Sequence, residues 1–402
     1  MRPFGDVISI AAARAIVGAA GTPLARRERV PLDEARRRVL AGDILSPRDV
    51  PPFARAAMDG YAVRALDTTG ATRAQPATLR VKDTIYTGQM ASAPVSAGEC
   101  FEIATGAPIP SGADAVVMVE ETAPGSAGTV QIFTAVGPGQ HVGQQGADIR
   151  SGQRVLGRGD LLTASRLGAV AAMGYADVEV FARPRVAIAS TGNEIVEPGT
   201  PLGPGQIHDV NRYTLASVVA EHGGVPVARA VVSDTLEALD RALDAALADD
   251  LVILSGGTSV GERDLIVDAV SRRGRVLFHG VAVKPGKPTL FGEIDGTPIF
   301  GMSGYPTSCL VNAYVLVVPL LRRLAHLPPH DPRRVSLPLA GPVRSVAGRH
   351  QFLTVRVADA LAHPMFKGSG DITSMAGADG YVEIPDTVDR LEAGETVEVV
   401  FF

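Results

Sequence analysis

The most constraining feature of the sequence is the stretch LVILSGGTSVGERD at residues 251–264. Its first four residues are apolar, which is typical of a strand buried on both faces of a helix-covered parallel sheet. The mainly small residues at 255–261 predict a loop whose backbone amides can approach an anion closely. Glu262 and Asp264 open an apolar-periodic helix through Leu265, Ile266 and Val270, so the stretch predicts a phosphate and metal site. An ordinary turn, whose acids only complement the helix dipole, accounts for the same residues equally well.

The length and composition limit the class of protein. A chain of 402 residues exceeds what one hydrophobic core usually supports, so roughly two to four domains are expected. Its 46% hydrophobic and 20% charged residues describe a globular protein. The net charge of -5 gives no overall basic surface, which argues against nucleic acid as the main partner. Any anionic ligand must therefore be held locally.

The cysteines and the apolar segments bear on localisation. Cys100 and Cys309 lie far apart and are the only cysteines, which argues against a disulfide framework or a zinc site and favours a reducing cytoplasm. The segment at 7–21 is preceded by Asp6 and interrupted by Arg14, so it predicts an amphipathic helix rather than a signal peptide. Because no run of about 18 uncharged apolar residues occurs, no membrane span is expected.

The N-terminal half predicts a small β domain inserted into a helical domain. Residues 1–50 are expected to be mainly helical, with Asp33 capping a helix that carries Ala35, Val39 and Leu40 and ends at Gly42. Prolines at 47, 51 and 52 mark a boundary. Short β-like runs follow at 78–81, 100–103, 115–119 and 129–133. Helical spacing resumes at 161–173, which makes the first domain discontinuous.

From residue 183 to about 327 the pattern alternates between strand and helix. Strands are predicted at 186–189 and 226–232, and helices at 213–222 and after a capping box of Asp234 and Glu237. This alternation predicts a parallel sheet that binds ligands beyond the carboxyl ends of its strands. Polar residues collect at these ends, at 190–194, 233–234, 255–264 and 301–308. Beyond the prolines at 328–332 a second small β domain is expected, ending in a strand at 396–402.

Other patches have both a functional and a structural interpretation. Lys284 and Lys287 lie in VKPGKP, whose prolines and glycine hold both ammonium groups near one place, and an oxyanion site is favoured over a solvated turn. Asp59 in the MDGY segment fits a metal ligand or a turn carboxylate, and the turn is favoured. The loop at 105–110 is interpreted as a plain strand connection. For His208 and His279 a structural hydrogen bond is favoured over metal binding.

Six motifs carry a family resemblance. They are PPFARAAMDGYAV at 51–63, TGAPIPSGADAVVMVE at 105–120, STGNEI at 190–195, SGGTSVGERD at 255–264, KPGKP at 284–288 and KGSGDITSMAGADGYVEIP at 367–385. In this order they resemble the molybdopterin molybdenumtransferases, the MoeA and gephyrin E-domain family, along nearly the whole chain. The YPTS sequence at 305–308 resembles an archaeal-type subgroup.

The resemblance implies an α/β multidomain fold in an L-shaped homodimer. Its subunit would have a discontinuous helical dimerisation domain at 1–50 and 140–182, an inserted small β domain at 51–139, a three-layer α/β molybdopterin-binding domain at 183–327 and a C-terminal β barrel at 328–402. The boundaries that composition indicates agree with this layout.

The resemblance also implies an activity, namely insertion of molybdate or tungstate into adenylylated molybdopterin, with Mg²⁺-dependent pyrophosphate cleavage and release of AMP. By resemblance, the catalytic residues are Asp264, Ser259, Asp59 and Glu194, and the three carboxylates among them are the metal ligands. The implied substrate-binding residues are Ser255, Gly256, Gly257, Thr258, Lys284, Lys287, Ser308, Thr105, Arg349 and Ser374. Besides the pterin nucleotide and the oxyanion, the implied partners are a second copy of the chain and a molybdopterin adenylyltransferase. Carboxylates suit hard Mg²⁺, and lysines would stabilise charge on phosphoryl oxygens.

Some residues depart from the family pattern. Ser303 stands where the family often has proline, Ala54 and Ala56 replace an Asp and a Ser, and residues 143–145 lack an arginine-rich turn. These changes indicate weaker affinity for an anionic substrate or a variant that handles tungstate.

Two other functions stay open. A molybdopterin adenylyltransferase is disfavoured because Ser259 stands where the loop of those proteins usually has glycine, and because they lack the MDGYA domain. A non-catalytic scaffold is disfavoured because Asp264, Lys284 and Lys287 are retained.

Overall fold

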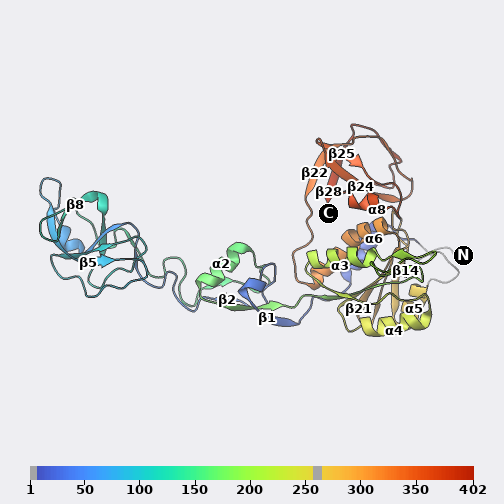
Figure 1. The fold of residues 1–402 in the computed structure, drawn as a ribbon, viewed down its shortest axis with the longest axis horizontal. Coiled ribbons are helices and arrows are strands. Elements are labelled where there is room, and N and C mark those ends of the chain that lie inside the picture. The colour runs from blue at the N-terminus through green and yellow to red at the C-terminus, as the bar shows by residue number, and fades with distance from the viewer. Residues whose placement is uncertain (1–6, 257–264) are drawn as a thin grey trace. The chain divides into compact units, whose positions relative to one another are not determined.

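The structure, a computed structural model, describes residues 7–256 and 265–402 (Figure 1). The chain divides into two compact units, each of which is described by itself. The first comprises Met1–Glu28, Arg37–Val39 and Val180–Phe402, and the second comprises Arg29–Arg36 and Leu40–Glu179.

A six-stranded sheet in the order β16-β13-β17-β21-β20-β18 lies in the first unit. Four strands are parallel neighbours: β16 (Val225–Ala228), β13 (Arg185–Ser190), β17 (Leu251–Ser255) and β21 (Thr297–Met302). The prediction of a parallel sheet is wrong for β20 (Leu290–Ile294) and β18 (Arg275–His279), whose pairings are antiparallel. Asp295 and Gly296, both at positive φ, join β20 to β21 as a two-residue turn, and such a turn connects antiparallel neighbours.

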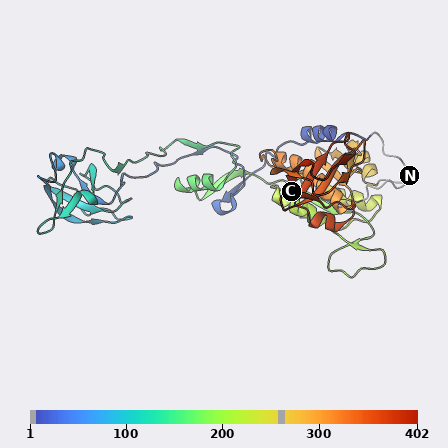
Figure 2. The ribbon, with the colours of Figure 1, turned by 90° about the horizontal axis from the view of Figure 1, so that it is seen from above.

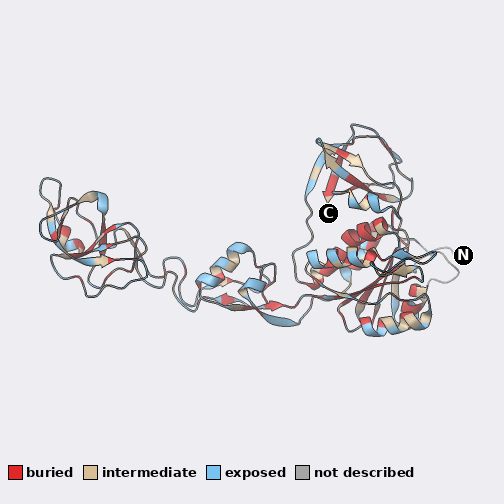
Figure 3. Cartoon of the chain, viewed as in Figure 1, coloured by how far each residue is buried: buried red, intermediate tan, exposed pale blue. Residues whose placement is uncertain are grey.

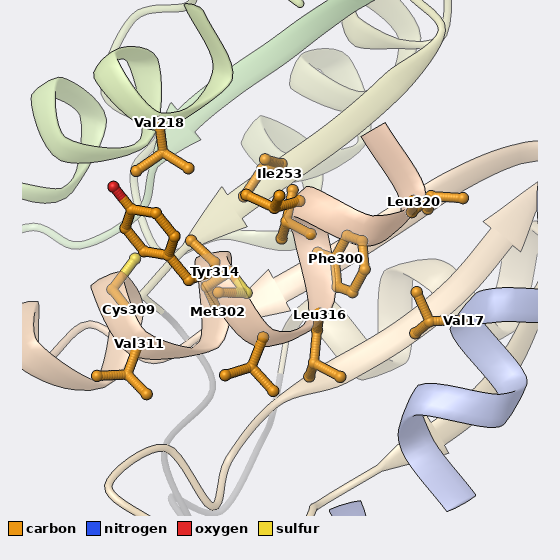
Figure 4. Close-up of a cluster of buried hydrophobic side chains, with 14 of the residues drawn as sticks. Val17, Val218, Ile253, Phe300, Met302, Cys309, Val311, Tyr314, Leu316 and Leu320 are labelled. Carbon is orange, nitrogen blue, oxygen red and sulfur yellow. The ribbon is translucent and has the colours of Figure 1, made fainter. Parts of the chain in front are cut away.

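Helices cover both faces of this sheet. On one face lie α1 (Ile10–Ala19), α3 (Asn211–Glu221), α6 (Pro306–Asn312), the π-helical turn η4 (Ala313–Val317) and α7 (Val318–Leu324); on the other lie α4 (Leu236–Ala246) and α5 (Leu265–Arg273). Strand β17 is buried throughout, as predicted: Leu251 and Ile253 join the first core cluster, and Val252 and Leu254 join the second. Figure 4 shows the first cluster, in which Ile253 and Phe300 of the sheet face the η4 turn.

The predicted helices at 213–222 and 161–173 are confirmed as α3 and α2 (Ala164–Ala172), and the N-terminal amphipathic helix is confirmed as α1. The predicted capping position of α4, Asp234, is wrong by one residue. Helix α4 begins after Thr235, whose hydroxyl oxygen accepts the backbone N–H of Ala238 at 3.2 Å. The predicted strand at 226–232 is shorter than expected, since β16 ends at Ala228.

Strands β14 (Ile195–Val196) and β15 (Ile207–His208) follow β13 and pair in parallel. The chain between them forms a loop that projects from the first unit (Figure 2). The imidazole Nε2 of His208 lies 2.9 Å from the Thr200 carbonyl oxygen, so the predicted structural hydrogen bond of His208 is confirmed.

One helical run among the described residues, Pro306–Leu324, is long and apolar enough to cross a membrane by length and composition. Of the window that meets this criterion, 83% is buried inside the protein (Figure 3). A buried core helix satisfies the same criterion, and this run packs between the sheet and the strands at the C-terminus.

The C-terminal strands form a sheet in the order β19-β24-β26-β28-β22, and β25 also pairs with β24. Their bounds are β19 (Val283–Lys284), β22 (Arg334–Pro338), β24 (His350–Ala358), β25 (Leu361–Pro364), β26 (Gly380–Ile384) and β28 (Thr396–Phe401). The pair β23 (Val343–Arg344) and β27 (Arg390–Leu391) and helix α8 (Ile372–Ala376) lie between them in the chain. The edge strand β19 ends at Lys284, the first residue of the KPGKP segment, so this segment begins within the sheet of the C-terminal strands.

An ionic cluster joins α1 to two of these strands. Glu383 of β26 accepts hydrogen bonds from Arg14 at 2.8 Å and from His350 Nε2 at 3.1 Å. Burial alone would raise the pKa of Glu383, but these hydrogen bonds outweigh burial and lower the pKa from 4.5 to about 2. Because the folded-state pKa is the lower one, the cluster stabilises the fold above pH 4.5 and loses this effect as the pH falls toward 2.

We therefore expect Glu383→Gln to lower the free energy of unfolding at neutral pH by about 1 to 3 kcal/mol, a range discounted for the partial exposure of the carboxylate. The difference from the parental chain should shrink as the pH falls from 4.5 toward 2. Urea denaturation across this range measures it. Glu398→Gln is the control, because Glu398 pairs with Arg334 at 3.4 Å with both side chains more than half exposed. A pH-independent difference for Glu383→Gln would contradict the assignment.

The second unit contains another six-stranded sheet. Its sheet has the order β7-β4-β6-β5-β9-β8. The bounds are β4 (Gly60–Val63), β5 (Ala77–Ile85), β6 (Glu99–Ile103), β7 (Ala115–Met118), β8 (Thr122–Pro124) and β9 (Thr129–Ile132). All four β-like runs expected from the sequence are confirmed. Two short pairs lie outside this sheet: β10 (Val142–Gly143) with β3 (Arg55–Ala56), and β11 (Arg154–Leu156) with β2 (Ile44–Leu45).

The prediction that residues 1–50 are mainly helical is wrong beyond α1. Asp33 lies in a 3₁₀ turn, η1 (Leu32–Glu34), and Arg37 has a φ of 60°, which interrupts any α-helix. The backbone N–H groups of Leu40 and Ala41 donate to the carbonyl oxygens of Asp160 and Glu179. The apolar residues at 35, 39 and 40 are buried, but hydrogen bonds to a distant segment replace the bonds that a helix would make within itself.

Candidate functional site

The loop after β17 begins with a close approach between two backbone segments. Gly256 has a φ of 104°, and a Cβ atom there would lie 2.2 Å from the carbonyl oxygen of Thr191. Only glycine fits this position without displacing the chain. The Gly256 N–H donates to the Met302 carbonyl at 3.1 Å, so the expectation that this amide holds a phosphate does not fit the structure. The role of Gly256 is to bring three strand ends together.

Ser255 is buried beside residues that the sequence analysis missed. Its hydroxyl oxygen accepts a hydrogen bond from Asn211 Nδ2 at 2.7 Å, and the same nitrogen donates to the Gly304 carbonyl at 2.9 Å. Asp209 is buried, accepts the Ser190 hydroxyl at 2.8 Å and lies 3.7 Å from Arg212 Nε. A signal was present, since the polar residues of HDVN stand directly before the predicted helix at 213–222.

Ser303 replaces the proline expected from the family pattern, and the structure shows how its loop is held. The Ser303 hydroxyl oxygen accepts the Tyr305 N–H at 3.2 Å, and the Ser303 side chain is buried. The position where the family often has proline is thus held by a local hydrogen bond of the kind that serine forms in turns.

Glu194 lies on the loop between β13 and β14, and its side chain is exposed. The Thr191 N–H, three residues earlier, donates to the Ser255 carbonyl at 2.7 Å. Glu194 and Ser255 therefore belong to loops at the same edge of the sheet, as the sequence predicts.

Lys284 and Lys287 occupy a backbone that is fixed at several points. Lys284 pairs in β19 with Gln351 of β24, and its Nζ lies 5.8 Å from the ring centre of Phe366. The Lys287 carbonyl accepts the N–H groups of Val281 and Thr289 at 3.0 and 2.9 Å. Both lysine side chains are half-buried, which differs from a freely solvated turn.

Ser308 and Ser374 are buried on helices that meet. The first turn of α6, which carries Ser308, is joined to the segment before α8 because the Thr307 N–H donates to the Ser369 carbonyl at 3.1 Å. The hydroxyl oxygen of Ser374 accepts the Lys367 N–H at 2.9 Å. Arg349 has an exposed side chain in the turn before β24.

Asp59 and Thr105 come together within the second unit. The Asp59 carboxylate accepts the Thr105 N–H at 2.6 Å and the Thr105 hydroxyl at 2.9 Å, and the backbone hydrogen bond is the main cause that lowers the pKa of Asp59. These bonds match the favoured interpretation of Asp59 as a turn carboxylate.

Four residues assigned by resemblance, Gly257, Thr258, Ser259 and Asp264, lie outside the described residues, as does Glu262. Within residues 7–256 and 265–402, no group of three or more His, Cys, Asp or Glu side chains could hold a metal ion.

Comparisons with known proteins cover nearly the whole chain. The MoeA N-terminal region (domain I and II) matches residues 8–174, a probable molybdopterin binding domain matches 187–323, and the MoeA C-terminal region (domain IV) matches 336–402. Molybdopterin molybdenumtransferase 2 of Mycobacterium tuberculosis (strain CDC 1551 / Oshkosh) is 38% identical over 382 residues, which cover 92% of this chain and 94% of that protein. Molybdopterin molybdenumtransferase of Haemophilus influenzae is 33% identical over 376 residues, 92% of each chain.

A solved structure of a molybdopterin biosynthesis MoeA protein from Pyrococcus horikoshii has a TM-score of 0.86 and 41% identity, and the match covers 98% of this chain and 99% of that one. A second, from Pyrococcus horikoshii OT3, has a TM-score of 0.80 and 30% identity over 99% of this chain and 100% of that one. The family models, the relatives and the solved structures agree over the same residues, and the chain belongs to the MoeA family of molybdopterin molybdenumtransferases.

Proposed function

We propose that this protein is a transferase of molybdenum cofactor biosynthesis that inserts molybdate into adenylylated molybdopterin and releases AMP. The observation that carries the proposal is the meeting of three loops at α6. Asn211 ties the Ser255 loop to Gly304, directly before α6, and Thr307 ties the start of α6 to the segment before Ser374. The lysine loop reaches the same helix, because Asn312 at its end donates to the Gly286 carbonyl.

Each group has a chemical role in this proposal. Lys284 and Lys287 would attract the oxyanion and neutralise its charge, and the hydroxyl of Ser308 would donate a hydrogen bond to it. The residues at 257–259 would hold the phosphates, and Ser374 and Arg349 would contact the substrate. Thr105 of the second unit is proposed separately as a substrate-binding residue. Asp264 and Glu194 of the first unit would hold Mg²⁺, which when bound neutralises charge on the pyrophosphate, and Asp59 of the second unit is proposed separately as a further carboxylate ligand.

Alanine at either lysine tests the oxyanion role. We expect Lys284→Ala and Lys287→Ala each to weaken molybdate binding about tenfold to a hundredfold, since each removes a charge-assisted contact. Stability should change by only about 0.5 kcal/mol. Calorimetric titration with molybdate, with the pterin bound, is the measurement. Arginine should not fully rescue either position, because its planar fork differs from a compact ammonium.

The matched control for this experiment is Lys82→Ala, which removes a lysine paired with Glu99 at 3.0 Å in the second unit. Unaltered molybdate affinity in both alanine variants would reduce the KPGKP segment to a structural turn.

The activity itself is tested by incubating the protein with adenylylated molybdopterin, Mg²⁺ and molybdate and following AMP. Release that depends on molybdate supports the proposal, and preference for tungstate in the same assay would identify a tungstate-inserting paralogue. Formation of adenylylated molybdopterin from ATP would instead indicate an adenylyltransferase. If the protein neither releases AMP from adenylylated molybdopterin nor forms adenylylated molybdopterin from ATP, a non-catalytic scaffold is indicated.

Finer features of the family layout belong to the same proposal. We assign the chain to an archaeal-type subgroup from YPTS at 305–308, keep the four domains at the boundaries expected above, and place the protein in the cytoplasm, where a molybdopterin adenylyltransferase would supply its substrate. The C-terminal strands are proposed as a small barrel. A bridge between Leu339 and Ala362, beside β22 and within β25, supports this closure.

We also propose a homodimer, as the family resemblance implies. Light scattering in dilute solution should give twice the mass of the 41.7 kDa chain. A monomer mass throughout the micromolar range would contradict this.

A further inference from the structure

Asn312 is a buried polar residue to which the proposed activity assigns no role. It is the last residue of α6 and is 1% exposed. Its Nδ2 donates to the Gly286 carbonyl at 3.0 Å and to the Thr289 hydroxyl oxygen at 2.7 Å. The Thr289 hydroxyl donates to the same carbonyl at 2.8 Å. One carbonyl in the middle of KPGKP is thus held by two donors.

The Gly286 backbone is also closely packed against the side chain of Asn312. Gly286 has a φ of 100°, and a Cβ atom there would lie 2.2 Å from Asn312 Nδ2. The amide therefore rests directly on the Gly286 backbone, at the point where the segment turns between Lys284 and Lys287. The strand pairing of Lys284 with Gln351 fixes the segment before this turn, and the bonds to the Lys287 carbonyl fix it afterwards.

Asn312 also connects the lysines to Ser308. The two residues are four apart on α6, so they lie on the same face of the helix. That face carries both a hydroxyl proposed to meet the oxyanion and the amide that holds the lysine loop. The π-helical turn η4 follows Asn312 directly, and such turns occur frequently at functional sites.

The side-chain amide of Asn312 makes both of these hydrogen bonds through its Nδ2 group. Its Oδ1 is buried and has no hydrogen-bond partner among the described residues. The orientation of the amide is determined by the Gly286 carbonyl, since only the NH₂ group can donate to it. A buried acceptor without a partner is uncommon in folded proteins, and its presence here is consistent with a site retained for function rather than stability.

We propose that Asn312 is a positioning residue that holds the Gly286 carbonyl and so fixes the backbone between Lys284 and Lys287, the two lysines of the proposed oxyanion site. A backbone released at Gly286 would let the two lysines move independently, so that they would no longer be held ready for one anion. The effect should therefore fall on molybdate and spare the pterin. This inference rests on the proposed function.

The test compares Asn312→Ala and Asn312→Asp with Val311→Ala. Asp keeps the size of Asn but its carboxylate cannot donate to Gly286, whereas Val311 is buried on the same helix within the first core cluster and accounts for lost packing alone. We expect the KM for molybdate to rise about tenfold in Asn312→Ala and further in Asn312→Asp, as loss of one or two hydrogen bonds predicts. The KM for adenylylated molybdopterin and the kcat at saturating molybdate should change by less than about twofold.

A second readout, independent of turnover, is hydrogen–deuterium exchange of peptides spanning 281–290. The amides of Val281 and Thr289, which bond the Lys287 carbonyl, should exchange faster in the Asn312 variants than in Val311→Ala. If Asn312→Ala does not fold, Asn312→Thr keeps one donor and should show a smaller molybdate defect in the same direction.

The outcomes separate cleanly. Parental exchange and parental molybdate KM in the Asn312 variants would overturn the inference, as would equal losses for molybdate and pterin, which indicate a structural residue. An unmodified protein that neither binds molybdate nor releases AMP would overturn the proposed function itself, and with it the oxyanion role of Asn312.

Discussion

Replacing Gly256 by alanine is expected to reduce AMP release by about a hundredfold, because a displacement of about 1 Å at a catalytic site costs about that much. The added Cβ would lie 2.2 Å from the Thr191 carbonyl oxygen, and the φ of 104° is itself strained for any residue with a side chain. The two strand ends must therefore separate, which moves the loop that starts at Ser255. AMP release and thermal unfolding, measured on the same preparation, test this expectation.

The matched control is Gly296→Ala in the turn between β20 and β21. Gly296 also has a positive φ, of 80°, but a Cβ there would meet nothing within 4 Å. This variant should lose about 1 kcal/mol of stability and keep parental AMP release. A folded Gly256→Ala protein with the parental rate would show that the approach to Thr191 has no part in the activity.

Asp264→Asn is expected to reduce AMP release by about a thousandfold or more while folding is retained. Asparagine keeps the size and much of the hydrogen-bonding capacity of aspartate, but it removes the charge proposed to hold Mg²⁺, a contribution worth several kcal/mol to phosphoryl transfer. The measurement is AMP release as a function of Mg²⁺ concentration, together with thermal unfolding.

Asp268→Asn distinguishes catalysis from the helix-dipole alternative. Asp268 lies in the first turn of α5, so its loss should cost about 0.3 to 1 kcal/mol of stability through the dipole alone and leave AMP release unchanged. If Asp264→Asn behaves in the same way as Asp268→Asn, the acids of this loop only complement the helix.

Local patterns in the sequence determined many elements and the edge at which the site forms. The apolar run at 251–254 became a strand buried on both faces, and the helix expected after Asp234 is α4, which buries Leu239 and Leu243. Such elements are predictable because strand and helix periodicity each report which residues face a core. The Asp295–Gly296 turn, which makes part of the sheet antiparallel, is also a local signal in the sequence.

Tertiary structure decided the remaining features. The residues at 35, 39 and 40 have helical spacing, yet their segment bonds to chain more than a hundred residues away and is not helical. The hydrogen bonds from Asn211 to Ser255 and from Asn312 to Gly286 likewise join residues distant in sequence. Hydrophobic periodicity in the sequence describes one helix or strand at a time. The hydrogen-bond partner of a buried amide or carboxylate is instead the backbone group that tertiary packing places within hydrogen-bonding distance of it.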